Sequence, residues 1–481
     1  MAMVTKEQTK PALISSSLAD LSTPIRPTRL LIHSRALRWA NERRAPLACS
    51  ALFILSAFAY FFFWGPVVEH RNVWIPPGDI WGTIHAAHYV AWGDLGQVYT
   101  AGTGLVTFPG ILIVIAPLAS LSSALGLAES FPFFLPRTTS WLLYGPFLYA
   151  LACSALFALD SLARKLGVPA SRRTALCLLE SVLLWPSQVL WGHPEDALAV
   201  ALAVWGLIAA MDRRLVATSW LYGLSIAVQP LTLLLAPLAF GMFAKRCWPG
   251  MLARAALIPG FLVGTCLLAA PKSTWRALVL QPNYFKVDHP TPLMAIAPRL
   301  SSQAVSAGPG RMLAVMAAMA IGLWLVPRAK QRASDAAWLV WLGALMLALR
   351  PLLESVMDPF YVWPALALGV VLAATMGTWR WLSAWAAAIF TTVCTFWHLA
   401  SWPYWLLLAA GLGALLLGVL PRQNLPGKGI AATIRRAPIL GAAALYSHHG
   451  PVVPLDGKAP PRARSSPGAL PGRYVNTPSR G

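Results

Sequence analysis

The chain is poor in charge, and in acidic residues most of all. Of its 481 residues, 17 are Asp or Glu and 38 are Lys or Arg, so charged residues make up 11%. A soluble domain carries about 25%. Hydrophobic residues make up 57% of the chain. This balance excludes an ordinary soluble domain and predicts a polytopic membrane protein.

Cysteine is also scarce. The six residues fall in or beside apolar segments and show no paired spacing: Cys49, Cys153, Cys177, Cys247, Cys266 and Cys394. We therefore interpret them as small core residues, not as disulfides or metal ligands. The sequence leads us to expect no bound metal and no cofactor.

The net charge of +21 is of a size that nucleic-acid-binding proteins also show. Here the basic residues are spread over the two tails and the short loops, which is where membrane proteins place cations on the cytoplasmic side. The expected partner is therefore the lipid bilayer, and not nucleic acid.

Three parts follow from composition. Residues 1–46 form a basic tail, residues 47–420 a membrane domain, and residues 421–481 a tail rich in Pro, Gly, Arg and Ser that cannot build a core. The first apolar run, 47–67, has no cleavage site after it and is read as an uncleaved anchor. The predicted fold is an all-α bundle of about twelve spans with both tails in the cytoplasm.

The segment 105–125 is ambiguous because Pro109, Gly110 and Pro117 disfavour a straight helix. If it is re-entrant or interfacial, the later basic loops all fall inside, as the charge rule requires. The loops at about 68–104 and 272–310, and the turns at 191–196 and 354–358, then face outside. The predicted location is the plasma membrane, with the chemically informative residues on its outer face.

Asp79 is the first candidate. It follows Gly78 in the loop after the first span, where a carboxylate can act as a general base. It can also cap a helix that begins at Ile80. The two roles are compatible, and we favour the base.

His85 and His88 lie three residues apart, so they share a helix face, and Tyr89 follows them. With Asp79 they could hold a divalent metal. We favour the alternative, in which they line a wet cavity or bind a phosphate.

The turn 191–196 contains His193, Glu195 and Asp196 around Pro194. Proline suits the first turn of a helix, and acids there interact well with the helix dipole. That explains the acids but not His193, so a structural and a substrate-binding role both stay open.

Cations gather in the long loop at 272–310, among them Arg276, Lys286 and His289. They suit a lipid phosphate, or equally a solvated loop near anionic headgroups. Arg350 and Asp358 could line the same site. A structural pair between Arg350 and Glu354, four residues apart on a helix, is the other interpretation.

Taken together, these motifs resemble the GT-C superfamily of membrane glycosyltransferases, and within it the actinobacterial mannosyltransferases that use polyprenyl-phosphate mannose. The similarity covers the layout of residues 47–420. Its motifs are an acid in the first outer loop (Asp79), a Gly-His-Pro-Glu-Asp turn (192–196) and a glycine-containing helix ending at Gln229-Pro230. The family usually has Lys where this chain has Gln229.

The resemblance implies an inverting transfer of mannose, or a related pentose, from a polyprenyl-phosphate donor to a cell-envelope glycan or glycolipid on the outer face. Asp79 would be the general base, and the other residues named above, Gln229 included, would bind substrate. Because the donor carries a single phosphate, no metal is implied. The alternatives are a non-catalytic scaffold that binds polyprenyl lipid and a flippase for lipid-linked precursors.

Overall fold

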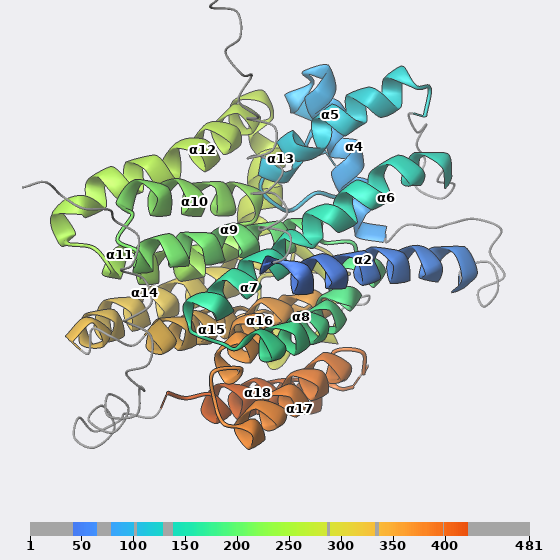
Figure 1. Ribbon diagram of the computed structural model, residues 1–481. Helices are drawn as coiled ribbons and strands as arrows, with labels where there is room; N and C mark the ends of the chain where they lie inside the picture. Colours follow the sequence, from blue (N-terminus) through green and yellow to red (C-terminus); the bar gives the residue numbers. More distant parts are fainter. Residues whose placement is uncertain are drawn as a thin grey trace, which may run out of the picture. The chain divides into compact units, whose positions relative to one another are not determined.

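The computed structural model describes residues 42–64, 78–100, 103–127, 138–285, 289–331, 336–397 and 399–421. Helices account for about 80% of these residues, which confirms the predicted all-α class (Figure 1). Nearly all of the two predicted tails, and Lys286, lie outside the described residues.

The helices follow one another with short connections. Those of the first half are α2 (Arg44–Ala59), α4 (Gly78–Trp92), α5 (Gly110–Ala124), α6 (Thr138–Ala152), α7 (Ser154–Lys165), α8 (Ala170–Trp185), α9 (Pro194–Met211) and α10 (Leu215–Val228). Those of the second half are α11 (Ala236–Gly241), α12 (Trp248–Ala269), α13 (Pro271–Trp275), α14 (Gly308–Gln331), α15 (Ala336–Leu353), α16 (Trp363–Ala373), α17 (Thr378–Cys394) and α18 (Ser401–Gly418). Single π-helical turns extend α2, α8 and α13 at Tyr60–Trp64, Pro186–Leu190 and Arg276–Leu280. Short 3-10 turns lie at Leu95–Gln97, Pro230–Leu235, Lys245–Cys247, Pro292–Ile296 and Pro359–Val362.

Prolines set several helix boundaries. Pro194 and Pro271 are the first residues of α9 and α13, where the missing N–H would have had no partner in any case. Helix α10 ends just before Pro230, and Gln229 between them is extended, with φ −150° and ψ 119°. A residue that precedes proline disfavours helical backbone, so the chain turns there.

Among the described residues, six helical segments are long and apolar enough to cross a membrane: Ser140–Lys165, Pro194–Met211, Lys245–Ala269, Gly308–Leu325, Ala336–Leu353 and Ser401–Gly418. The chain is therefore of the multi-pass helical membrane type. Six is fewer than the number predicted because other expected spans form shorter helices. Helix α10 has 14 residues, for example, and a straight span needs about 20.

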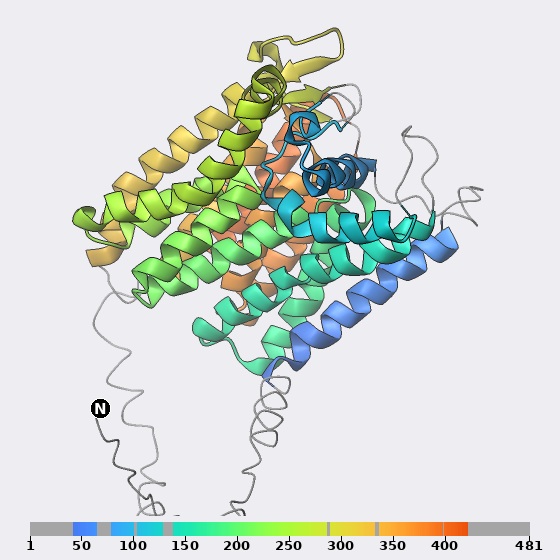
Figure 2. The same cartoon turned by 90° about the horizontal axis from the view of Figure 1, so that it is seen from above.

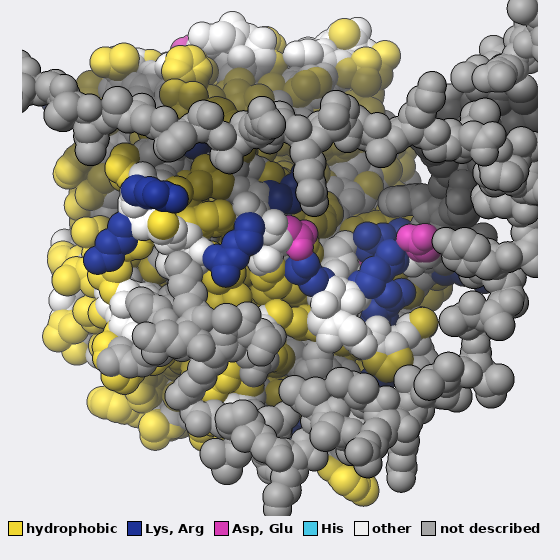
Figure 3. Space-filling view, turned by 60° about the vertical axis from the view of Figure 1, so that its left-hand side comes forward, with side chains coloured by type: hydrophobic (Ala, Val, Ile, Leu, Met, Phe, Trp, Pro, Cys, Tyr) yellow, Lys and Arg dark blue, Asp and Glu magenta, His cyan; other side chains and the backbone are white. Residues whose placement is uncertain are grey.

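The cationic loops meet at one end of the bundle, which we call the basic end. Its contacts are Arg164 with Glu42, Lys165 with Asp212, Arg172 with the Ala374 carbonyl, Arg213 with the Met242 carbonyl and Arg380 with the Gly418 carbonyl. Figure 3 shows this end, where Lys and Arg side chains gather with few acids between them. Glu42 and Gly418, near the two limits of the described chain, both lie here.

The opposite end of the bundle, the site end, holds the π-helical extension of α2 and the start of α6. There the Phe61 and Trp141 rings are 5.9 Å apart. Helix α2 thus ends at the end of the bundle at which α6 begins. Between α2 and α6 in the chain, helix α5 packs on α4.

The core lies around α9 and α16. All eleven residues of α16 are buried, and 72% of the α9 segment is buried, against 22% for Lys245–Ala269 and for Gly308–Leu325. The small and β-branched side chains of α16 let neighbouring helices approach it. Helices α12 and α14 lie along one side of the bundle (Figure 2) and expose apolar faces, as lipid-facing helices do.

Two short antiparallel strand pairs order the loops at the site end. Strand β1 (Pro282–Tyr284) pairs with β3 (Ala304–Ser306), and β2 (His289–Pro290) pairs with β4 (Val356–Met357). The second pair ties the loop after α13 to the turn after α15. Gln281, just before β1, has φ 47°, a left-handed conformation that a non-glycine residue seldom adopts.

The close approach of α5 to α10 supplies a test of the fold. A Cβ on Gly110 would lie 2.3 Å from the Ala227 carbonyl oxygen, whereas one on Gly264 would meet nothing within 4 Å. We expect Gly110→Ala to destabilise the protein by about 1–3 kcal/mol. The control Gly264→Ala should be neutral or slightly stabilising, because alanine favours helix. Thermal unfolding in detergent measures both, and equal midpoints would contradict this packing.

Candidate functional site

Asp79 lies at the start of α4 and is 57% exposed. Gly78 and Asp79 open the helix, where the N-terminal dipole favours a negative charge. The Asp79 Oδ2 atom is 3.0 Å from His193 Nε2. The first loop and the turn at 191–196, two motifs 114 residues apart in the chain, therefore meet at one place.

His193 is held from several sides. Its Nδ1 is 2.7 Å from Glu195 Oε1, and its ring stacks on Phe360 with centroids 3.6 Å apart. Its carbonyl accepts a hydrogen bond from Gln188 Nε2. The left-handed Gly192, with φ 77°, and Pro194 shape the turn that presents the ring. We call Asp79, His193 and Glu195 the acid–histidine cluster.

The charge of His193 follows from its two carboxylate neighbours. Burial by itself lowers the pKa of His193, but Glu195 first and then Asp79 outweigh that effect and raise the pKa well above its ordinary value. The imidazolium form is therefore favoured, with one carboxylate at each ring nitrogen.

Asp196 lies beside this cluster on α9 and accepts a hydrogen bond of 2.7 Å from Gln229 Nε2. The Gln229 Oε1 atom accepts in turn from the Thr107 hydroxyl at 3.1 Å. Through its amide nitrogen and its amide oxygen, Gln229 thus connects α9 to the segment before α5. The Asp196 Oδ2 atom is buried and has no hydrogen bond among the described residues.

Arg350, at the end of α15, is 8% exposed. Its guanidinium lies 3.6 Å from the Tyr361 ring centroid, and its Nε is 3.6 Å from Glu354 Oε1. It also lies within electrostatic range of Asp196, the residue that follows Glu195. Its Nη1 atom has no hydrogen-bond partner among the described residues.

Arg311, which the sequence reading missed, completes this group. It donates to Glu354 Oε1 at 2.6 Å, to Gln281 Oε1 at 2.6 Å and to the Tyr361 hydroxyl at 2.8 Å. We call Arg311, Arg350, Glu354 and Tyr361 the arginine cluster. The sequence signal for this cluster is Arg311 itself, a single arginine at the start of an apolar span. A charged residue at such a position is a functional candidate by default.

The remaining described candidates, His289, Asp358 and Arg276, differ in their surroundings. The His289 ring is buried and stacks on Tyr404 at 4.6 Å, and Asp358, just after β4, acts electrostatically on Tyr361 and Tyr404. Arg276 is exposed. The structure thus brings His289 and Asp358 to the site end near the arginine cluster and leaves Arg276 on the surface.

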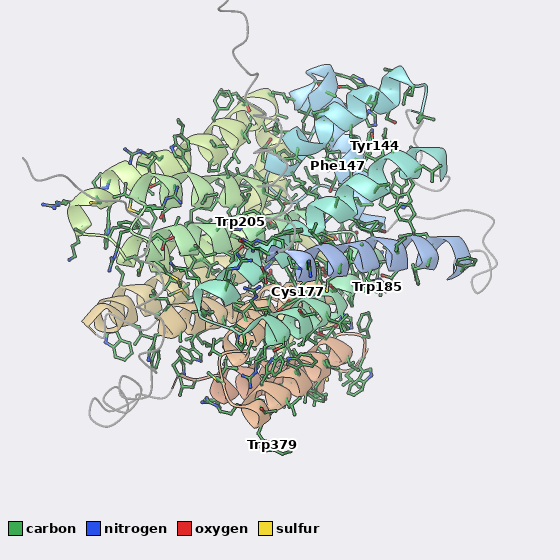
Figure 4. All side chains as sticks on the ribbon, in the orientation of Figure 1. Tyr144, Phe147, Cys177, Trp185, Trp205 and Trp379 are labelled. Carbon is green, nitrogen blue, oxygen red and sulfur yellow. The ribbon has the colours of Figure 1, made fainter. Side chains whose placement is uncertain are left out.

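The other candidates of α4 point elsewhere. His88 follows Asp79 by nine residues, and an α-helix rotates by about 100° per residue. His88 therefore lies about half a turn around the helix axis from Asp79. His88 Nε2 is 3.1 Å from the Tyr144 hydroxyl and Nδ1 is 3.3 Å from Ser123 Oγ; Tyr144 is labelled on α6 in Figure 4. Burial and then the neighbouring His85 lower the pKa of His88. The rings of His85 and Tyr89 contact each other at 4.8 Å.

Within the described ranges, no group of three or more His, Cys, Asp and Glu residues could hold a metal ion. Comparison of the chain with models of protein families, with curated proteins and with solved structures found no match. The acid–histidine and arginine clusters are therefore the features of the described chain that point to a function.

The raised pKa of His193 predicts a pH dependence of stability. A group whose folded pKa exceeds its unfolded value, about 6.5 for His, stabilises the fold fully below that value and loses this effect as pH rises through the folded pKa. We expect the midpoint temperature of thermal unfolding to decrease as the pH is raised from neutral to alkaline values. The substitution His193→Gln should make this decrease smaller. The control His88→Gln should preserve it. An alkaline slope unchanged by His193→Gln would contradict the assignment.

Proposed function

We propose that the protein is a membrane glycosyltransferase that moves a sugar, mannose by resemblance, from a polyprenyl-phosphate donor to a cell-envelope glycan or glycolipid. The observation that carries this proposal is the acid–histidine cluster. An exposed carboxylate, Asp79, is held by a buried and charged histidine at one end of an apolar bundle. Few roles other than proton transfer or substrate binding call for such an arrangement there.

In the proposed reaction, Asp79 accepts the proton of the acceptor hydroxyl as its oxygen attacks the anomeric carbon of the donor. The bond between that carbon and the phosphate oxygen breaks, so polyprenyl phosphate leaves and the anomeric configuration inverts. His193 positions Asp79 through the hydrogen bond to Oδ2, and Glu195 orients the histidine ring. Both are positioning residues in this scheme.

Arg350 is the cation best placed to offset the charge of the leaving phosphate. Its guanidinium is buried, and one nitrogen has no hydrogen bond among the described residues. Cations held in place before the reaction stabilise charge that develops in the transition state. His289, and Lys286 on the same loop, are proposed to assist, whereas the exposed Arg276 is proposed to act on headgroups at the surface.

We further propose that the chain crosses the plasma membrane about twelve times, with the basic end in the cytoplasm and the site end outside. The segment 105–125 would be re-entrant. The clustering of cations at the basic end supports this orientation through the charge rule. Irregular backbone at membrane depth is tolerated where protein surrounds it, and α5 has α4 and α10 as neighbours.

Cysteine labelling in intact cells tests the orientation. Arg246, at the basic end, and Tyr284, in β1 at the site end, are both exposed, and five of the six native cysteines are buried. We expect an impermeant maleimide to label Tyr284→Cys in intact cells, and Arg246→Cys only after permeabilisation. The parent protein sets the background from Cys247. The reverse pattern would put the basic end outside and overturn the proposal.

Asp79→Asn tests the catalytic role. Loss of a general base typically slows a reaction by about 10²–10⁴-fold, and an exposed carboxylate contributes little to folding. We expect the purified variant to fold, to bind donor and to lose transfer by that factor, as measured with radiolabelled polyprenyl-phosphate mannose in vesicles. Asp94→Asn, another exposed acid of the same region, is the control and should retain activity.

Three results would count against this function. Full turnover by Asp79→Asn would exclude Asp79 as the base. Donor binding without transfer by the parent protein, under every acceptor tried, would favour a scaffold. Movement of the intact donor across the vesicle membrane would favour a flippase.

A further inference from the structure

A third cluster of buried charge lies at the basic end, far along the helices from the acid–histidine and arginine clusters. Its centre is Asp160 on α7, whose side chain is fully buried. Asp160 Oδ2 is 2.7 Å from Arg43 Nη1 and 3.8 Å from Arg164 Nη2, and Oδ1 is 3.1 Å from Arg173 Nε. We call these four residues the Asp160 cluster. It joins the start of α2 to α7 and α8.

The cluster carries more positive charge than its acids offset. Three guanidinium groups share one buried carboxylate, and within the described part of the chain the only other acid bonded to them is Glu42, which is 62% exposed. All three arginines keep some exposure, with side chains 18%, 34% and 15% accessible for Arg43, Arg164 and Arg173. Asp160 therefore fixes three cations beside one another at the surface without neutralising them.

An apolar surface begins next to these cations. Helices α2 and α8 pack side by side (Figure 1), and at their other end Trp185 of α8 donates to Ser56 of α2; Trp185 is labelled in Figure 4. Along this pair Leu52 and Leu55 of α2, and Leu178 and Val182 of α8, are each more than half exposed. Spacings of three and four residues put each pair on one helix face.

We propose that the Asp160 cluster and the surface between α2 and α8 bind one anionic phospholipid. The phosphate would lie against the guanidinium groups of Arg43, Arg164 and Arg173, and the acyl chains would follow the exposed leucines. Planar guanidinium groups bind phosphate oxygens well, and basic sites between membrane helices suit anionic headgroups. A zwitterionic lipid is disfavoured because its own ammonium would face the same cations. This site is independent of the proposed transfer reaction.

The full-length protein in neutral detergent supplies the test. Mixed micelles with phosphatidylglycerol should raise its thermal midpoint, whereas phosphatidylcholine or inorganic phosphate at the same concentration should not. Arg164 is the most exposed of the three arginines and the one farthest from the Asp160 carboxylate. The substitution Arg164→Gln should therefore leave the fold intact. We expect the variant to need about ten times more phosphatidylglycerol for the same rise in thermal midpoint. A factor of this size corresponds to the loss of one charged hydrogen bond.

The matched control is Arg246→Gln, which removes an exposed cation from the same end of the bundle but on the segment before α12. It should leave the phosphatidylglycerol effect unchanged. An equal loss in both variants would show attraction to bulk negative charge and overturn the site. Stabilisation by inorganic phosphate to the same extent would overturn the lipid assignment.

A second readout covers the case in which Arg164→Gln lowers the midpoint by itself. Spin-labelled phosphatidylglycerol in phosphatidylcholine vesicles should show a motionally restricted component with the parent protein. That component should shrink with Arg164→Gln and persist with Arg246→Gln. Restriction that is the same in all three proteins would refute the proposal.

Discussion

A charge inside an apolar bundle needs a partner, and this constraint organises both ends of the molecule. At the site end His193 is held between Asp79 and Glu195, and Arg311 is bonded to Glu354. At the basic end Asp160 is surrounded by arginines. Removing a fully buried acid such as Asp160 or Glu354 would leave its arginine partners partly buried and uncompensated, which costs far more than an exposed ion pair returns. The connections between helices are therefore fixed by where the few charged residues find each other.

The sequence was sufficient for features that depend on local pattern. The all-α class followed from apolar runs, and the helix that begins at Pro194 followed from its proline and the acids after it. The approach of Arg350 to Glu354 followed from their spacing of four, although at 3.6 Å this is the looser of the two contacts that Glu354 Oε1 makes with arginine. The position of Asp79 at the start of a helix was also expected from its local sequence. Such features need only the geometry of one helix or one turn.

What the sequence did not reveal lies in contacts between distant segments. Nothing local to Asp79 indicates that His193 will hold it, and nothing local to Gln229 indicates Thr107 as a partner. In the sequence Arg311 is an ordinary residue at a span boundary. Only the tertiary structure shows that it donates hydrogen bonds to Gln281, a residue with left-handed backbone, and to the Tyr361 hydroxyl. His85 and His88 show the converse. Their spacing is that of a shared face, but His88 lies half a turn around α4 from Asp79 and contacts Tyr144 of another helix.

The bond between Arg43 and Asp160 has a consequence for how the protein is made. Its two ends are separated by 117 residues, so α2 leaves the ribosome long before α7 exists. During that interval α2 has at its boundary an arginine without its Asp160 partner, and it lacks α8, the helix beside which it finally lies. It can acquire its final position only when the hairpin of α7 and α8 has been inserted. Assembly of this chain is therefore not strictly in order of synthesis: α2 reaches its final contacts only after α7 and α8 have been made.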